Sequence, residues 1–200
     1  MDDPELIEAN GEGAELFDVP VAFYLTFRES IERWHALKSR TDTVIHELLL
    51  SLGDPIADLA QQHQLESRFV ELGGRYCGFF IAEAEAPTDR EGVAPISFGL
   101  GWQRDDVVPE REGSEPYVGV RVSRDSPESR SRFLEYGHPS TRELRAAGGY
   151  DKHTLWPVFR YVHARPAWWS DLDAYRFALT SELGKVMTQF KAGFEATSHS

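Results

Sequence analysis

The 200-residue chain has few cysteines, few basic residues and no long apolar run. Its single cysteine, Cys77, excludes an intramolecular disulfide and a cysteine-rich zinc site, and it is typical of a protein from a reducing compartment. No apolar run approaches the length of a transmembrane helix. The acidic N-terminus lacks the basic and apolar regions of a signal peptide. These absences predict a cytoplasmic protein with no membrane segment.

The chain also has fewer basic than acidic residues. Lysine and arginine together number 21 against 33 aspartates and glutamates, so the formal net charge is −12. A field of that sign disfavours direct binding to nucleic acid, because phosphate contacts depend on lysine and arginine. The acidity has four interpretations: a basic protein partner, mimicry of nucleic acid, a salty cytoplasm, or good solubility. Solubility is the favoured one.

Motifs for common catalytic chemistry are also missing. The chain has no G-x-x-x-x-G-K-[ST], no G-x-G-x-x-G that opens a helix and no H-E-x-x-H. The nearest approach to a site is the group of His138, Asp151, His153 and His163, for which solvated or core histidines are the favoured interpretation. Cys77 lies among aromatic residues and is interpreted as a small buried hydrophobic residue. We therefore expect no metal and no cofactor.

Two carboxylates support an alternative. Glu83 and Glu85 alternate in the run IAEAEA, and on a strand they would point to one face and could bind a divalent cation. Two outward acids near a strand end are the favoured interpretation. The alternative function is a metal-dependent hydrolase or degenerate nuclease that uses these acids and one of the later histidines.

The first third of the chain predicts an arm followed by helices. Residues 1–17 are acidic and aperiodic, which predicts a flexible arm ahead of a single domain over 18–197. Residues 21–38 show helical spacing of apolar side chains, at Phe23, Phe27, Ile31, Trp34 and His35. We expect Thr41 or Asp42 to cap a second helix and Asp54 to cap a third.

Beyond residue 64 the period changes to that of strands. Two β-rich runs separated by Gly73-Gly74 predict a hairpin. Residues 96–103 alternate, with Ile96, Phe98, Leu100 and Trp102 on one face and two glycines on the other. Those glycines, Gly99 and Gly101, favour the close approach of a side chain or helix, with a flat floor for a ligand as the alternative. Residues 117–123 alternate again, so we predict an antiparallel meander of about four to five strands.

The last third returns to helices around one strand. Asp125 is expected to cap a helix, and Ser170 a long terminal helix with a continuous apolar stripe. A strand is predicted over residues 156–163. Because strands run together instead of alternating with helices, the predicted class is α+β, with the terminal helix packed on the sheet.

The segment WPVFRYVHARPAWW, residues 156–169, is unusually rich in aromatic side chains. Trp168 and Trp169 precede the terminal helix, and at least one of them is expected to staple its start. On the predicted strand, one face carries Trp156, Val158, Arg160 and Val162, and the other carries Pro157, Phe159, Tyr161 and His163. Aromatic and arginine side chains anchor recognition surfaces more often than other types do. The candidate ligand-binding residues are Arg160, Tyr161, His163 and Trp156.

Several short motifs in the second half of the sequence resemble those of a known protein family. EPYVGVRVSRDSPES, WPVFRYV, WW and the terminal FKAGFEA together resemble the C-terminal accessory region of bacterial PD-(D/E)XK nuclease-superfamily proteins. The preceding helices and meander are similar in order. The signature of the nuclease, an aspartate followed by an E-x-K strand, is not found, so no catalytic residue carries over. The resemblance implies a recognition part without a cutting part, in a defence or nucleic-acid-processing system.

The leading expectation is therefore a non-catalytic binding or accessory module of a bacterial or phage system. It would recognise a protein or small ligand through an aromatic and arginine surface. A homo-oligomer built through the terminal helix is compatible with this function and with the hydrolase alternative.

Overall fold

The structure, a computed structural model, describes residues 19–104, 115–135, 149–151, 153–163 and 171–198. The chain divides into two compact units, Met1–Arg40 and Thr41–Ser200. Several predictions concern residues outside the described ranges. They are the arm over residues 1–17, the staple at Trp168 or Trp169, the cap at Ser170, and His138.

One long helix, α1 (Val19–Leu50), replaces the two helices predicted for this region. The predicted break at Thr41 or Asp42 is wrong, because no glycine or proline interrupts residues 21–52. Asp42 is buried within α1 and does not begin a helix. The helix departs from regular geometry at Phe27 instead, where φ is −110° and ψ is 15°.

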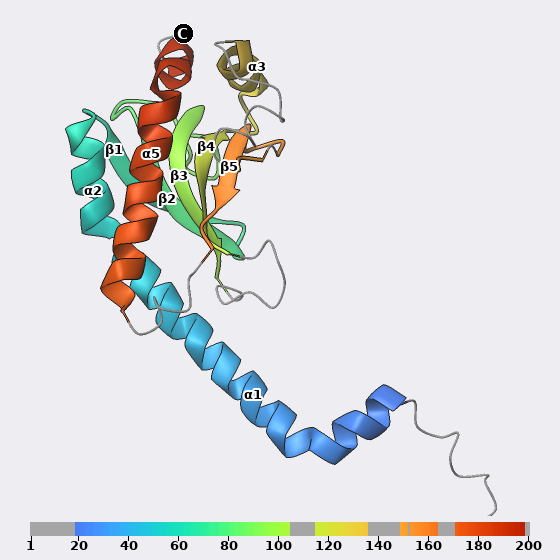
Figure 1. The fold of residues 1–200 in the computed structure, drawn as a ribbon. Helices are drawn as coiled ribbons and strands as arrows, with labels where there is room; N and C mark the ends of the chain where they lie inside the picture. The colour runs from blue at the N-terminus through green and yellow to red at the C-terminus, as the bar shows by residue number, and fades with distance from the viewer. Residues whose placement is uncertain (1–18, 105–114, 136–148, 152, 164–170, 199–200) are drawn as a thin grey trace, which may run out of the picture. The chain divides into compact units, whose positions relative to one another are not determined.

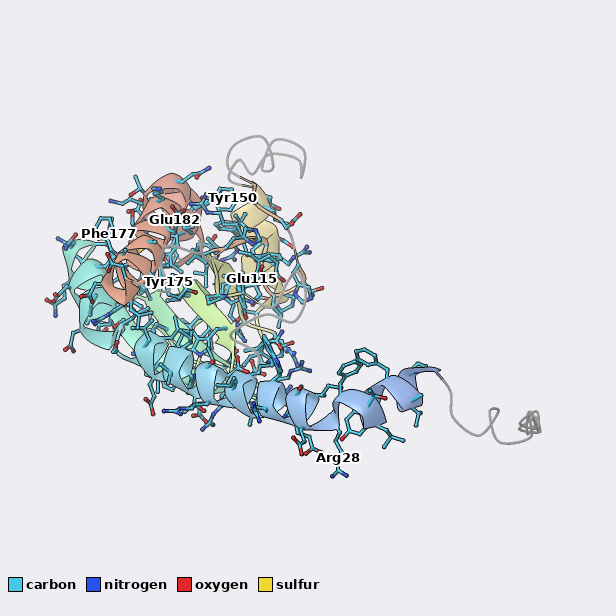
Figure 2. The ribbon with its side chains drawn as sticks, turned by 60° about the horizontal axis from the view of Figure 1, so that its bottom comes forward. Arg28, Glu115, Tyr150, Tyr175, Phe177 and Glu182 are labelled. Carbon is cyan, nitrogen blue, oxygen red and sulfur yellow. The ribbon has the colours of Figure 1, made fainter. Side chains whose placement is uncertain are left out.

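The first unit exposes Phe23, Phe27 and Trp34, three of the apolar residues that the sequence places on one helix face. Phe23 is 59% exposed and Trp34 is 74% exposed. Across the irregular turn at Phe27, Tyr24 Oη and Arg28 Nε both donate to Glu32 Oε1, at 3.1 Å and 2.9 Å. The side chain of Arg28, labelled in Figure 2, is largely exposed.

Five strands form one antiparallel meander in the order β1-β2-β3-β4-β5 (Figure 1). Their bounds are β1 (Glu66–Leu72), β2 (Tyr76–Ala82), β3 (Ile96–Gln103), β4 (Tyr117–Val122) and β5 (Val158–Tyr161). The hairpin predicted at Gly73-Gly74 is confirmed, and both glycines have positive φ, at 62° and 78°. The strand order is the one expected when each strand pairs with its neighbour in sequence.

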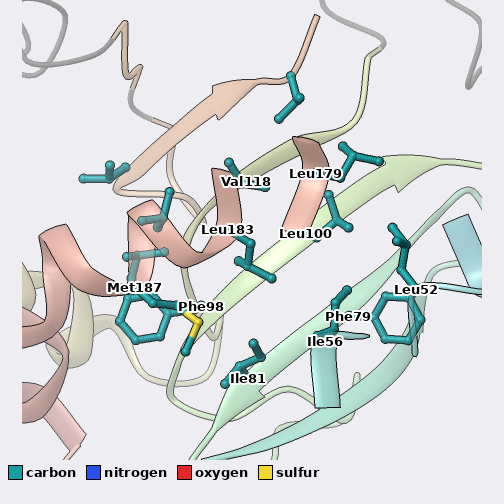
Figure 3. Packing of buried hydrophobic residues seen from close by; sticks show 14 of the residues in the cluster. Leu52, Ile56, Phe79, Ile81, Phe98, Leu100, Val118, Leu179, Leu183 and Met187 are labelled. Carbon is teal, nitrogen blue, oxygen red and sulfur yellow. The ribbon is translucent and has the colours of Figure 1, made fainter. Parts of the chain in front are cut away.

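Helices cover one face of this sheet. α5 (Leu172–Ser198) packs on β3 and β4, and α2 (Gly53–Gln62) packs on β1. The main core lies between them, and Figure 3 shows Leu179, Leu183 and Met187 of α5 over Phe98 and Leu100 of β3. Burial of these side chains is the main contribution to the stability of the fold. The predicted α+β class, with the terminal helix packed on the sheet, is confirmed.

Helix ends differ slightly from their predicted caps. α2 begins at Gly53, so Asp54 lies in the first turn, where its charge suits the helix dipole but does not cap it. α3 (Pro127–Glu135) begins at its proline, which places the cap at Ser126 and not at Asp125. Asp171 Oδ1 accepts the Ala174 N–H at 3.0 Å and caps α5.

Within the described parts of the chain, no helix is both long enough and apolar enough to cross a bilayer.

Candidate binding site

The second face of the sheet has its own, smaller aromatic cluster. Val70, Phe80, Val93 and Trp156 are buried together there. Gly99 makes this packing possible: a Cβ on Gly99 would lie 2.8 Å from Trp156 Cη2 and 3.0 Å from the ring of Phe80. The interpretation of this glycine as a point of close side-chain approach is therefore supported.

Gly101 has the same relation to Tyr117. A Cβ on Gly101 would lie 2.7 Å from Cζ of that ring, which therefore lies close against the backbone of β3. Tyr117 meets the ring of Trp156 edge-on, with centroids 4.9 Å apart, and also meets Phe159 and Tyr161 edge-on, at 6.2 Å and 6.0 Å. Such edge-to-face pairs fix ring orientation, so the four rings form a defined wall.

A cavity of about 510 Å³ opens beside these rings. Its aromatic lining consists of Tyr76, Tyr117, Trp156, Phe159 and Tyr161, from β2, β4, β5 and the segment before β5. The volume is within the range of pockets that hold small ligands. We call this the sheet cavity.

Charged residues lie at one end of the sheet cavity. Arg121, on β4, and Arg124 both line it, as does Glu91. Arg121 is only 1% exposed, and its Nη2 donates to Glu91 Oε2 at 2.7 Å. Its guanidinium also lies over the ring of Phe80, 5.3 Å from the centroid, a favourable cation–π arrangement.

A loop built around Asp89 presents Glu91 to Arg121. Asp89 Oδ1 accepts the backbone N–H groups of Glu91 and Val93, both at 2.9 Å, and Oδ2 accepts the hydroxyl of Ser123 at 2.7 Å. Burial alone would raise the pKa of Asp89, but these hydrogen bonds and the charge of Arg121 lower it below the ordinary value. The carboxylate of Asp89 therefore organises the loop in its ionised form.

A third arginine lines the opposite end of the sheet cavity. Arg75 follows the Gly73-Gly74 turn, and its Nη2 donates to Gln103 Oε1 at 3.0 Å. Its guanidinium lies 5.8 Å from the centroid of Tyr76. The sheet cavity thus has an apolar centre and polar ends.

Two tyrosines of the sheet cavity, Tyr117 and Tyr161, are held in their neutral form. Burial raises the pKa of Tyr117 above that of free tyrosine. Burial, followed by the charge of Glu115, raises the pKa of Tyr161 as well. Neutral phenols present hydroxyl donors and flat apolar rings to a bound molecule.

The structure separates the four candidate ligand-binding residues. Trp156 and Tyr161 both line the sheet cavity. The assignment of Trp156 to the same face as Arg160 is wrong, because β5 begins at Val158 and Trp156 precedes the strand's alternation.

Arg160 lies on the helix-covered face instead. It forms an ion pair with Glu182 of α5, and its guanidinium lies 4.9 Å from the centroid of Tyr150. Glu182 and Tyr150 are both labelled in Figure 2. Arg160 thereby links β5 to α5. His163 pairs through Nδ1 with Glu115 Oε1 at 3.0 Å, and its side chain is largely exposed.

The histidines do not form a metal site in the described residues. No group of three or more metal-ligating side chains occurs among those residues. His153 lines the sheet cavity, and its Nδ1 accepts the Leu155 N–H at 3.5 Å. His46 Nδ1 accepts the indole N–H of Trp102 at 2.9 Å, so it supports the core. Cys77 is buried in the main core, as predicted for a small hydrophobic residue.

The carboxylate pair of the hydrolase alternative does not lie on a strand. β2 ends at Ala82, Glu83 follows it, and Glu85 lies in a turn. Strand alternation therefore does not place Glu83 and Glu85 on one face, which was the reason for pairing them.

Comparison with protein-family models, curated proteins and solved structures finds no match for this chain. The resemblance to the accessory region of nuclease-superfamily proteins stays a prediction.

Proposed function

We propose that the chain is a non-catalytic binding module that holds a ligand in the sheet cavity. The observation that carries the proposal is the aromatic wall of Tyr117, Trp156 and Phe159 beside a cavity of about 510 Å³. Binding pockets are typically concave and mainly apolar, with a few polar groups that orient the ligand. The sheet cavity has this composition, with arginines at its ends.

The position of the sheet cavity supports the same proposal. Its walls are rooted on β2, β3, β4 and β5, whose other face is packed against α5 and α2. Sites built on strands are held more rigidly than sites on loops. A preorganised wall lowers the cost of binding, because fewer side chains lose freedom when the ligand arrives.

We further propose that this module is an accessory part of a bacterial or phage defence or nucleic-acid-processing system, in the cytoplasm. The resemblance noted in the second half of the sequence supports this role. The net charge of −12 supports recognition of a protein or small ligand in preference to nucleic acid.

The test is a fragment screen by ligand-observed NMR on the full chain. We expect hits that compete with one another and whose binding weakens in Tyr161→Ala, because Tyr161 lines the sheet cavity. Phe177→Ala is the matched control, since Phe177 is an aromatic residue of α5 that is 75% exposed and points away from the sheet (Figure 2). Hits that bind equally to both variants, or a screen without hits, would contradict the proposal.

A protein partner is the second form of the same proposal. Co-purification of the chain from its native host tests it, and recovery of the chain alone, with no partner or bound small molecule, counts strongly against it. A homo-oligomer through α5 would use exposed Phe177. Light scattering of the wild type and Phe177→Ala distinguishes this assembly, because only the wild type is then expected to associate.

A further inference from the structure

The lining of the sheet cavity has the opposite charge to the chain. Three arginines, Arg75, Arg121 and Arg124, line it against the single carboxylate of Glu91 among the described residues. The whole chain carries a formal charge of −12. A cationic pocket in an acidic protein attracts an anionic ligand locally while the remaining surface repels it, which favours ligands small enough to enter the pocket.

Arg121 has hydrogen-bonding capacity that the described residues do not use. Its Nη2 is occupied by Glu91, but its buried Nε and Nη1 have no hydrogen-bond partner in the described part of the chain. The hydroxyl of Ser97, which lies opposite Arg121 in the β3–β4 register, likewise has none there. Buried polar groups without partners are costly, so an additional acceptor near Arg121 would stabilise this end of the cavity.

Arg124 adds an accessible charge at the same end. Its side chain is exposed, unlike that of Arg121, and it lies three residues further along the chain. At the other end, Arg75 already donates to Gln103 and lies against the ring of Tyr76. The end with Arg121 and Arg124 is therefore the better place for an anion.

We infer that the ligand of the sheet cavity is a small aromatic compound that carries one anionic group, a carboxylate or a phosphate. Its ring would lie against Tyr117 and Trp156, and its anion would lie at the end formed by Arg121 and Arg124. This inference rests on the proposed function, since it names the ligand class of the same cavity. Arginine recognises both anions through the same planar array of N–H donors.

The experiment compares four probes that share one ring system: 2-naphthoate, 2-naphthyl phosphate, neutral 2-naphthamide and cationic 2-naphthylmethylamine. Each is titrated into the full chain by calorimetry or ligand-observed NMR at fixed ionic strength. We expect at least one anionic probe to bind about tenfold or more tightly than the amide, which corresponds to one charge-assisted hydrogen bond. The cationic probe should bind most weakly. The stronger of the two anions identifies which anionic group the site prefers.

Two variants locate the anion. Arg124→Gln should reduce the affinity for the preferred anion about fivefold, and Glu91→Gln should raise it, because the competing carboxylate is lost while an oxygen remains for Arg121. The affinity for 2-naphthamide should change little in both variants. Arg132→Gln, at an exposed position of α3 outside the cavity lining, is the matched control and should leave all four affinities unchanged.

The failures are distinguishable. If 2-naphthamide binds as tightly as both anions, and Tyr161→Ala weakens it, the anionic ligand class is overturned while the proposed function stands. If none of the four probes binds, although other fragments compete for the cavity, the aromatic anion is again overturned alone. If Arg75→Gln weakens anion binding more than Arg124→Gln does, the placement of the anion is wrong. If no ligand at all depends on Tyr161, the proposed function fails as well.

Discussion

The two faces of the sheet are both apolar, yet they are built from different side chains. The face under α2 and α5 uses mainly aliphatic residues and phenylalanine, and helices cover it in Figure 1. The other face uses glycines at Gly99 and Gly101, with large rings lying across them. Alternation along the same strands separates the two sets. One face is therefore a packed core, and the other is a hollow with rigid walls.

The difference shows how a sheet can support binding without losing stability. The helix-covered face supplies the burial that holds the strands in register, so the second face need not be filled. A glycine beneath the rings lets them lie close to the backbone, where a larger side chain would displace them. The two faces should consequently respond differently to the same kind of change.

The largest effect is expected on the helix-covered face. Leu183→Ala removes a completely buried side chain of α5 and should lower the free energy of unfolding by about 2 to 5 kcal/mol. Urea denaturation measures this loss. Phe177→Ala, on the exposed side of the same helix, should change stability by less than about 0.5 kcal/mol. Equal effects of the two variants would show that α5 does not pack as described.

A smaller loss is expected from a methyl group added to the cavity face. Gly99→Ala places a Cβ 2.8 Å from Trp156 Cη2, so it should cost about 1 to 3 kcal/mol through overpacking. It should also weaken binding in the sheet cavity, because Trp156 must move.

Gly184→Ala is the control for that substitution. A Cβ at Gly184 would meet the side chain of Leu59 at ordinary contact distance, 3.6 Å to Cδ1 and 3.9 Å to Cδ2, and alanine favours the helical conformation of α5. Thermal and urea denaturation should show a gain of about 0.5 to 1 kcal/mol. A loss at Gly184 as large as that at Gly99 would contradict the close packing proposed for Trp156.

Adjacent residues of β5 should separate stability from binding. Arg160→Met removes the ion pair with Glu182 and should cost about 1 kcal/mol with no change in fragment binding. Tyr161→Ala should weaken fragment binding instead, because Tyr161 points to the sheet cavity. The readouts are urea denaturation and ligand-observed NMR. Loss of binding in Arg160→Met would show that the two faces are not independent.

The smallest effect is expected on the pH dependence of stability in acid, to which Asp89 contributes. Because the pKa of Asp89 is lowered in the folded state, its contribution to stability is full above the unfolded pKa of about 4 and is lost as pH falls towards the folded value. In Asp89→Asn the stability should therefore depend less on pH below about 4. Urea midpoints measured across this range test it, and an unchanged slope would contradict the role given to Asp89.

Much of the fold follows from local patterns. The hairpin at Gly73-Gly74 and the alternation of side chains between the two faces of β3 are short-range features, and both are confirmed. The continuity of α1 cannot be predicted in this way, because a residue such as Asp42 has the same chemistry at a helix cap and inside a helix. Burial, which decides between the two, depends on residues distant in sequence.

The site is less predictable than the fold. Tyr117 and Arg121 were missed, although YVGVRV already places them on the face opposite its valines. That alternation, combined with the glycines of β3, is the signal that could have identified them. No local pattern brings Arg75 or Glu91 to the cavity, because each comes from a connection between strands and is placed by the sheet's register. The ion pair of Arg160 with Glu182 is not predictable from the sequence either, because the two residues belong to different elements that only the fold brings together.

The meander also has a consequence for how the chain folds during synthesis. Its strands pair only with sequence neighbours, which keeps contacts local within the sheet and favours rapid formation. The helix that covers the sheet, α5, is translated after all five strands. In a newly made sheet, the aliphatic face that α5 later buries is therefore exposed to solvent. Until α5 emerges from the ribosome, that face is a candidate for chaperone binding and for aggregation.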